Sequence, residues 1–324
     1  MPKWGFSMTE GKVVEWLVPE GSEIARGDEV IEVETDKSVG VVEAPVTGLL
    51  RRHVATSGQD IPVGGLVGVV ADASVTDAEI DEFVKSFVVE SSAAQADSPR
   101  DKPEFVTIDG RSIRYLKQGD GGEPVVLIHG FTGSLNNWAY HQSALAGERA
   151  VYSLDLPGHG QSSKDVGDGS LEFLTGIVKQ WLDVVGIERA HLVGHSLGGG
   201  IALSLTLDAP KRVHSATLIA SAALGSEIDA EYVHGVVEAD RRKELKPFLE
   251  RLFADPNLAT RQMVDEVLKF KRIDGVPSAL KRLAEKFVSD GRQQTNYRNR
   301  LNELGVPVQV VWGERDRIVP SSHA

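Results

Sequence analysis

Cysteine is absent from the 324 residues of this sequence. The absence excludes disulfide bonds, iron–sulfur clusters, thiolate zinc sites and a cysteine nucleophile, and we expect no metal site. No apolar run approaches the roughly 18 residues of a membrane-spanning helix, and the amino end lacks the apolar core of an export signal. These absences predict a cytoplasmic protein with no membrane partner, whose only thiols arrive on a cofactor.

Basic residues are scarce in the first third of the chain. Residues 1–104 hold 9 basic and 20 acidic side chains, and the net charge of the whole chain is −12. Because nucleic acid binding requires a basic face, this balance argues against a nucleic acid partner. The 41% of hydrophobic residues is typical of globular proteins, and the length predicts two domains.

An internal repeat with an offset of 37 residues occupies the amino end. Glycines recur at matched places of the two copies: Gly11, Gly21 and Gly27 in the first, and Gly48, Gly58 and Gly64 in the second. Each copy consists of short β-rich runs separated by glycine, which predicts two interlocked copies around one small all-β core. We expect the matched glycines at turns that require a positive φ.

The segment that joins the two copies holds a lysine between two strand-like runs. Residues 32–43 read EVETDKSVGVVE, which predicts a hairpin with Lys37 at its tip. Without further evidence, Lys37 could equally be an unmodified surface lysine, as most lysines are.

Three motifs in residues 1–74 resemble the lipoyl domain of 2-oxo acid dehydrogenase-type complexes. They are MPKWGFSMTEGKV at the start, GDEV at 27–30 and ETDKS at 34–38. The resemblance implies a flattened all-β barrel and a lipoate covalently attached to Lys37 by a lipoate ligase or lipoyl transferase. Biotin-carrying domains of the same fold have methionine on both sides of the lysine, whereas Lys37 follows Asp36 and precedes Ser38.

Residues 75–104 differ in composition from their surroundings, with many alanines, serines and acidic residues. This predicts an acidic linker that contains one short helix over residues 77–88. Four apolar side chains share a face of that helix: Ile80, Phe83, Val84 and Phe87. We expect this face to pack against the chain itself, with partner binding as the alternative.

From residue 105 onward, apolar strand-like runs alternate with helical periodicity. The runs lie at 125–128, 150–154, 191–193, 216–219 and 306–312. Alternation of this kind predicts a mostly parallel sheet with helices on both faces. The charge-rich helical segment 222–304 is predicted to be a lid, inserted between the sixth and seventh strands of the sheet.

The motif GHSLG at 194–198 has the G-x-S-x-G spacing of a nucleophile elbow, in which a serine lies on a tight turn between a strand and a helix. Side chains at the two glycine positions, Gly194 and Gly198, would clash with the neighbouring strand and helix. The blocks LIHGFTG at 127–133, DLPGHGQS at 155–162 and VVWGERDRIVP at 310–320 accompany it.

With these blocks, residues 105–324 resemble the α/β-hydrolase superfamily. The resemblance implies that Ser196 is the nucleophile and Asp316 the acid of a catalytic triad. It also implies that the backbone N–H groups of Phe131 and Leu197 form the oxyanion hole. His129 and Asp155 are expected to hold the neighbouring loops.

The chain departs from that superfamily at the base. The resemblance places a histidine beyond the acid and one further strand, but this chain ends eight residues after Asp316. We therefore expect the carboxyl end to be incomplete and the chain as given to be inactive at Ser196, since a serine nucleophile depends on a base. The alternatives are a scaffold without a triad, or His195 or His323 as the base.

A lipoyl domain followed by an α/β-hydrolase domain resembles the dihydrolipoamide acetyltransferase component of acetoin dehydrogenase complexes. The resemblance implies that an acetyl group is carried on lipoyl-Lys37 and passed to coenzyme A. The implied partners are a thiamine-diphosphate-dependent dehydrogenase component and dihydrolipoamide dehydrogenase, in an oligomeric complex. Because no His-x-x-x-Asp-Gly motif is present, acetyl transfer would use Ser196. The alternatives are a serine hydrolase (a thioesterase or carboxylesterase) with a tethered lipoyl domain, and a non-catalytic lipoyl carrier.

Overall fold

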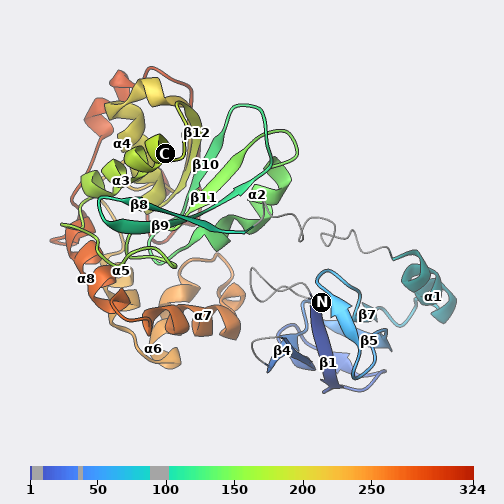
Figure 1. Ribbon diagram of the computed structural model, residues 1–324. Helices are drawn as coiled ribbons and strands as arrows, with labels where there is room; N and C mark the ends of the chain where they lie inside the picture. The colour runs from blue at the N-terminus through green and yellow to red at the C-terminus, as the bar shows by residue number, and fades with distance from the viewer. Residues whose placement is uncertain (2–9, 36–38, 88–101) are drawn as a thin grey trace. The chain divides into compact units, whose positions relative to one another are not determined.

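The computed structural model describes residues 1, 10–35, 39–87 and 102–324 (Figure 1). The chain divides into two compact units, Met1–Asp101 and Lys102–Ala324. Within the described ranges, no helix has the length and apolar character needed to cross a membrane.

The amino-terminal unit is built of short strands. They are β1 (Glu10–Trp16), β2 (Glu23–Ile24), β3 (Glu29–Glu34), β4 (Val39–Glu43), β5 (Gly48–His53), β6 (Asp60–Pro62) and β7 (Gly68–Ala71). One sheet has the order β4-β3-β1-β6 and the other the order β2-β5-β7, so each sheet takes strands from both copies of the repeat. The apolar side chains between the sheets, among them Val13, Ile31 and Leu50, form a single core. The prediction of two interlocked copies around one core is confirmed.

The matched glycines of the repeat fall into two classes. Gly21, Gly27, Gly58 and Gly64 have φ values of 87°, 93°, 84° and 83°, as predicted for turns that exclude a Cβ atom. The prediction is wrong for Gly11 and Gly48, which lie within β1 and β5 without a positive φ. At Gly48 the requirement is space, because a Cβ there would lie 2.9 Å from Cγ1 of Val70.

Helix α1 (Asp77–Ser86) packs on the amino-terminal unit. The Thr76 hydroxyl accepts the Glu79 N–H and the Glu79 carboxylate accepts the Thr76 N–H, so both residues cap the first turn. Ile80 is buried, which confirms that the helix packs against its own chain. The expected apolar face is only partly used, since Phe83 and Phe87 are 48% and 37% exposed.

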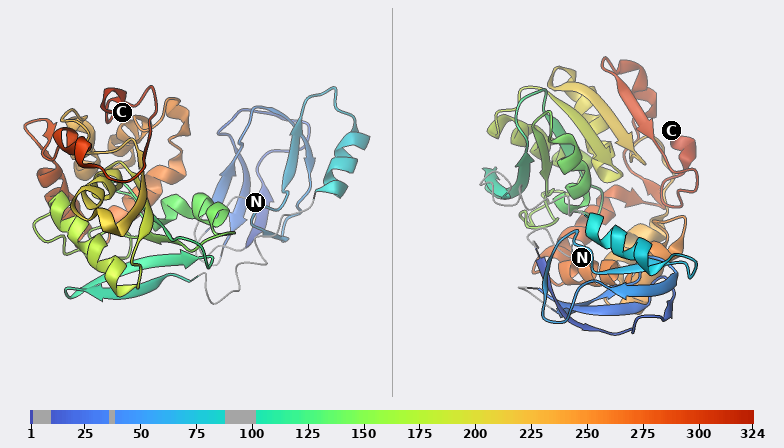
Figure 2. Two further views of the ribbon diagram at one scale, coloured as in Figure 1. Left: turned by 90° about the horizontal axis from the view of Figure 1, so that it is seen from above. Right: turned by 90° about the vertical axis from the view of Figure 1, so that its right-hand side faces the viewer.

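The carboxyl-terminal unit contains a seven-stranded sheet with the order β16-β13-β12-β10-β11-β9-β8 (Figures 1 and 2). The strands are β8 (Glu104–Ile108), β9 (Arg111–Gln118), β10 (Val125–Ile128), β11 (Val151–Leu154), β12 (Ala190–His195), β13 (Val213–Ile219) and β16 (Val308–Val311). All neighbours from β11 to β16 in this order pair in parallel, whereas β8 and β9 pair antiparallel. The mostly parallel sheet is confirmed, and the β8–β9 hairpin is an addition that the sequence analysis did not predict.

Both faces of this sheet are covered. Along β10, Val126 and Ile128 pack into the large core under the helices, whereas Val125 and Leu127 pack on the other side against Trp138. The helices are α2 (Ala139–Leu145), α3 (Leu171–Val184) and α4 (Leu197–Asp208). Short 3-10 turns lie at Leu135–Trp138, Pro210–Arg212, Pro256–Leu258, Arg298–Glu303 and Ser321–His323.

The chain between β13 and β16 forms a helical layer, and most of its buried apolar side chains make a second core that also includes Ile318 and Val319 from beyond β16. Its elements are α5 (Ala230–Glu238), α6 (Arg242–Glu250), α7 (Arg261–Lys271), α8 (Val276–Phe287), β14 (Val288–Ser289) and β15 (Arg292–Gln293). The predicted insertion between the sixth and seventh strands of the sheet is confirmed.

Candidate active site

Ser196 lies at the turn between the end of β12 and the first residue of α4. Its backbone has φ 52° and ψ −116°, a conformation that costs a residue with a Cβ on the order of 1–3 kcal/mol. Three hydrogen bonds hold the turn. The Ser196 N–H donates to the Ile219 carbonyl at 2.9 Å, and the Ser196 carbonyl accepts the N–H groups of Gly200 (3.1 Å) and Ala222 (2.9 Å).

The glycines of the elbow are required by close backbone contacts. A Cβ on Gly194 would lie 2.2 Å from the Gly198 carbonyl oxygen, and one on Gly198 would lie 2.2 Å from the Ile128 carbonyl oxygen. The predicted clash with the helix and the neighbouring strand is confirmed. Because neither position has a side chain, the start of α4 packs directly against the end of β10. The loop after β10 consequently lies next to Ser196.

The loop after β10 lies beside Ser196. A Cβ on Gly130 would be 3.1 Å from the Cβ of Ser196, and Phe131 follows directly. Leu197 is the first residue of α4, where a backbone N–H has no acceptor within the helix. Neither the Phe131 nor the Leu197 N–H donates a hydrogen bond to another described residue. The arrangement leaves both groups available to an oxyanion.

Two buried histidines hold that loop. Nδ1 of His129 donates to the Gly130 carbonyl at 2.8 Å, and Nε2 accepts the Leu156 N–H at 3.0 Å. Nδ1 of His159 donates to the Pro157 carbonyl at 3.0 Å, and Nε2 accepts the N–H of Thr132 at 3.2 Å. Burial lowers the pKa of both imidazoles.

The loop held by these histidines is strained at Thr132, a β-branched residue with φ 60°. The His159 contact that holds it was missed by sequence reasoning, because DLPGHGQS does not show which loop His159 meets.

Asp155 is a loop anchor. Its carboxylate is buried and accepts the N–H groups of Leu135 (2.8 Å) and Gln161 (2.9 Å), and it lies 3.4 Å from a guanidinium nitrogen of Arg114. Because all of these contacts are to the chain itself, the prediction that His129 and Asp155 hold neighbouring loops is confirmed.

Asp316 lies in the turn after β16. Its Oδ1 accepts the N–H groups of Ile318 (2.8 Å) and Val319 (3.0 Å). Because β16 pairs in parallel with β13, and β13 pairs in parallel with β12, the turn that holds Asp316 lies at the same edge of the sheet as Ser196. The fold therefore brings Asp316 to the elbow across 120 residues of sequence.

Helix α5 of the inserted segment meets the site at two points. The N–H of Asp229, the cap of α5, donates to the Ile318 carbonyl at 2.8 Å. Tyr232 in the first turn is buried, which raises the pKa of its phenol, and a side-chain hydrogen bond with Thr132 opposes that rise. Sequence reasoning did not find Tyr232, since no motif marks it.

No described histidine hydrogen-bonds to the Ser196 hydroxyl. His323 is buried, and its Nε2 lies 2.9 Å from Oε2 of Glu227, where the imidazole lowers the pKa of that carboxyl to about 2. His195, the residue before Ser196, is exposed. The described residues thus include Ser196, Asp316 and the unpaired backbone N–H groups of Phe131 and Leu197, without an imidazole hydrogen-bonded to the Ser196 hydroxyl.

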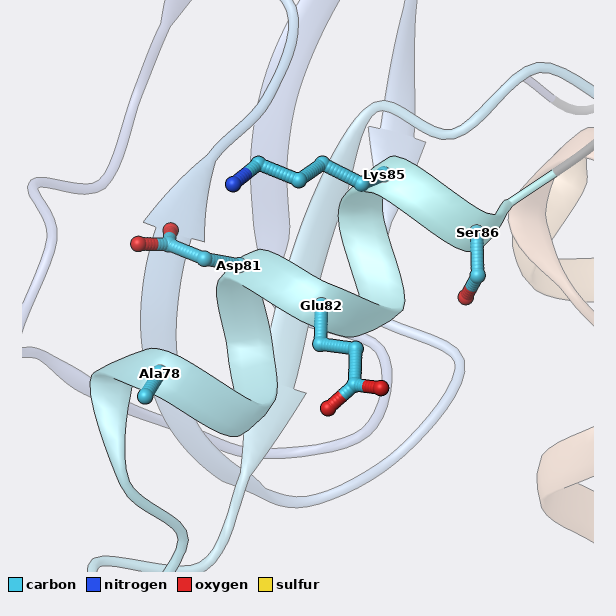
Figure 3. A pocket seen from close by; sticks show the side chains of 5 residues that line it. All are labelled: Ala78, Asp81, Glu82, Lys85 and Ser86. Atoms are coloured by element: carbon cyan, nitrogen blue, oxygen red, sulfur yellow. The ribbon is translucent and has the colours of Figure 1, made fainter.

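The predicted lipoyl hairpin is formed by β3 and β4, which pair antiparallel from Glu29 and Glu43 to Glu34 and Val39. Lys37 itself lies outside the described residues. An open hollow in the same unit runs along α1 beside Ala78, Asp81, Glu82, Lys85 and Ser86 (Figure 3). It holds none of the predicted catalytic residues.

Two family models match the chain. One, described as alpha/beta hydrolase fold, matches residues 123–324, and the other, described as Biotin-requiring enzyme, matches residues 1–70. Two relatives match this chain over its full length. They are the dihydrolipoyllysine-residue acetyltransferase components of the acetoin cleaving systems of Pseudomonas putida (48% identical, 88% of the relative covered) and Cupriavidus necator (46%, 87%).

Other similarities concern the second unit. A 2-hydroxy-6-oxononadienedioate/2-hydroxy-6-oxononatrienedioate hydrolase of Paraburkholderia phymatum is 30% identical over 64% of this chain and 76% of that enzyme. A hydrolase structure from Pseudomonas aeruginosa is 25% identical with a TM-score of 0.56, covering 68% of this chain and 83% of that one. The meta-cleavage product hydrolase from Pseudomonas fluorescens is 21% identical with a TM-score of 0.62, covering 68% and 82%. This last similarity shows the fold alone.

Proposed function

The chain belongs to the family of dihydrolipoyllysine-residue acetyltransferase components of acetoin cleaving systems, which carry an α/β-hydrolase domain, and we propose that Lys37 and Ser196 are its two working residues. It is a lipoyl-bearing acyltransferase and one component of a multienzyme system. We assign lipoyl carriage to residues 1–74, a linker role to 75–104 and acetyl transfer to 105–324. The proposed partners are a thiamine-diphosphate-dependent dehydrogenase component and dihydrolipoamide dehydrogenase.

The β3–β4 hairpin suits a lipoyl attachment site. Glu34 and Val39 are paired, so the residues between them join two strands of a rigid sheet. Lipoic acid, attached through an amide to Lys37, supplies the dithiol on which acetyl groups are carried as thioesters. An arm on a tethered unit reaches the second unit at high effective concentration.

We assign acetyl transfer to the elbow. Ser196 Oγ attacks the carbonyl carbon of an acetyl thioester, an oxygen–carbon bond forms, and the carbon–sulfur bond breaks with release of the thiol. Coenzyme A then takes the acetyl group through its own sulfur and restores the hydroxyl. The N–H groups of Phe131 and Leu197 stabilise the developing oxyanion, each worth about 3–4 kcal/mol in a working site.

Asp316 would orient the base that takes the Ser196 proton. No described imidazole hydrogen-bonds to Ser196 Oγ. The base of this proposal is therefore a group that the described hydrogen bonds do not include. The strained turn at Ser196, φ 52° with glycines on both sides that admit no Cβ, is the observation that supports a nucleophile over a packing residue.

Intact mass measurement tests the lipoyl site. After co-expression with a lipoate ligase, the chain should gain one lipoyl adduct that Lys37→Ala abolishes. Lys12→Ala, at an exposed lysine in β1 of the same unit, should retain the adduct. An unmodified wild-type chain, under conditions that lipoylate a control domain, contradicts the assignment.

A hydrolase that uses water is the second candidate, favoured by the 30% identity of the second unit to a hydrolase. Acetyl thioester turnover, measured with and without coenzyme A, separates the two. Formation of acetyl-coenzyme A that Ser196→Ala abolishes supports the transferase. Release of free acetate at the same rate in both cases supports the hydrolase. Transfer unaffected by Ser196→Ala contradicts the role of Ser196.

A further inference from the structure

The turn that holds Asp316, residues 312–319 (the acid turn), is held by the segment inserted between β13 and β16. Asp316 Oδ1 accepts the N–H groups of Ile318 and Val319. The Ile318 carbonyl in turn accepts the N–H of Asp229 at 2.8 Å. Because Asp229 is the N-cap of α5, a short chain of hydrogen bonds joins this helix to the Asp316 carboxylate.

Apolar packing joins the same two parts of the chain. The side chains of Ile318 and Val319 are buried in one core with Val233 of α5. Apolar contacts of this kind are not directional, so they fix where the acid turn lies but not how its carboxylate points. The orientation of the Asp316 carboxylate therefore depends on the hydrogen bonds.

Asp229 is itself held by an ion pair with the end of α6. Its Oδ1 accepts the Tyr232 N–H at 2.9 Å, which caps α5, and its Oδ2 lies 2.8 Å from Nη1 of Arg251. The other terminal nitrogen of Arg251 lies 3.0 Å from the Glu231 carboxylate. The Asp229 and Arg251 side chains are only 20% and 27% exposed, so water screens their attraction less than it would at an open surface.

The Arg251 guanidinium has a rigid support. Helices α5 and α6 pack against each other (Figure 1). They do so closely, since a Cβ on Gly235 of α5 would lie 2.1 Å from the Phe248 ring of α6. The Arg251 guanidinium lies 5.2 Å from the centroid of the same ring. Arg251 thus ties the amino end of α5 to a fixed point on α6.

We propose that Arg251 is a positioning residue for acetyl transfer, because it fixes the orientation of the Asp316 carboxylate through Asp229. The guanidinium contacts no reacting atom and acts by limiting the motion of the acid turn. The inference rests on the proposed function, in which Asp316 orients the base of Ser196. A displacement of about 1 Å in a catalytic site can lower the rate about 100-fold.

The other end of α6 offers a matched control. Nη2 of Arg242, the first residue of the helix, donates to both carboxylate oxygens of Asp265 at 2.7 and 2.9 Å. This ion pair also joins two helices of the inserted segment. Its described hydrogen bonds do not reach the acid turn, so Arg242→Gln removes a comparable ion pair without a route to Asp316.

Hydrogen exchange of the full chain tests the positioning directly. In Arg251→Gln the N–H groups of Ile318 and Val319 should exchange roughly tenfold faster than in the wild type, because the acid turn opens more often. They should keep the wild-type rate in Arg242→Gln. Asp229→Asn retains the cap and the N–H to Ile318, so it should show the same acceleration even if Arg251→Gln fails to fold. Wild-type exchange in Asp229→Asn, or equal acceleration in Arg242→Gln, overturns the proposal.

Ser196-dependent acetyl transfer to coenzyme A provides a second readout. Arg251→Gln should lower kcat about tenfold and leave KM unchanged, whereas Arg242→Gln should leave both unchanged. Arg251→Lys keeps a cation for Asp229 and should recover most of the loss. A raised KM with an unchanged kcat in Arg251→Gln overturns the proposal. Absence of Ser196-dependent transfer in the wild type instead contradicts the proposed function, and hydrogen exchange then decides the inference by itself.

Discussion

Lowering the pH from 7 to 5.5 should destabilise the carboxyl-terminal unit by up to about 2.5 kcal/mol through His129 and His159. Both imidazoles are almost inaccessible to solvent, at 1% and 0% exposure, and each uses Nε2 as an acceptor for a backbone N–H. If Nε2 were protonated, its N–H would face the backbone N–H that it accepts in the neutral form, and neither donor would have an acceptor. Burial therefore lowers both pKa values from the ordinary 6.5, although the Asp155 carboxylate opposes this at His129.

The sign follows from proton binding. Below pH 6.5 the unfolded chain binds protons at these positions and the folded chain does not, so the free energy of unfolding falls as the pH falls. Each histidine contributes a slope of up to about 1.4 kcal/mol per pH unit. If neither histidine is protonated in the folded state, integrating this slope from pH 7 to 5.5 yields a loss of about 1.3 kcal/mol in the free energy of unfolding for each histidine.

Denaturant unfolding followed by the fluorescence of the fully buried Trp181 measures this dependence. His159→Gln retains an amide oxygen as an acceptor and removes the titration, so it should halve the pH dependence. His141→Gln, at an exposed histidine of α2, should leave the dependence unchanged. A wild-type unfolding free energy that is flat from pH 7 to 5.5, or an unaltered slope in His159→Gln, refutes the reasoning.

Three further outcomes are expected. The 324-residue chain should hydrolyse a p-nitrophenyl ester no faster than its Ser196→Ala variant, because no described histidine contacts the hydroxyl; Ser196-dependent turnover would identify an existing histidine as the base. Gly198→Ala should destabilise the second unit by at least about 3 kcal/mol in denaturant unfolding, since its Cβ would lie 2.2 Å from the Ile128 carbonyl oxygen; a near-neutral effect would mean that the elbow relaxes. In an NMR titration the Glu227 carboxyl should stay ionised until about pH 2, and its pKa should return to the ordinary value in His323→Ala. Because the pKa of this carboxyl is lower in the folded chain, the stabilisation by the Glu227–His323 pair is lost as the pH falls from about 4.5 toward 2.

Local signals were enough to predict much of the fold. The apolar run at 125–128 coincides with β10, and the run at 216–219 lies within β13, because parallel strands buried on both faces must be continuously apolar. The β8–β9 hairpin lies at the edge of the sheet, β8 is mostly exposed, and the buried stretch of β9 includes Arg114, so neither strand has that continuous apolar run. Phe83 and Phe87 have the spacing of a buried face but remain exposed, since periodicity does not show what a helix packs against.

The sequence by itself determined the repeat, the strand-turn-helix context of Ser196 and the positions of Lys37 and Asp316, because each is a relation between neighbouring residues or matched copies. Only the tertiary structure decided which distant groups meet. It set His159 against Thr132, His323 against Glu227 and Asp229 against Ile318, over separations of 27, 96 and 89 residues. Such pairs depend on how loops converge at one edge of the sheet, and a hydrogen bond between them leaves no periodic or compositional trace in the chain.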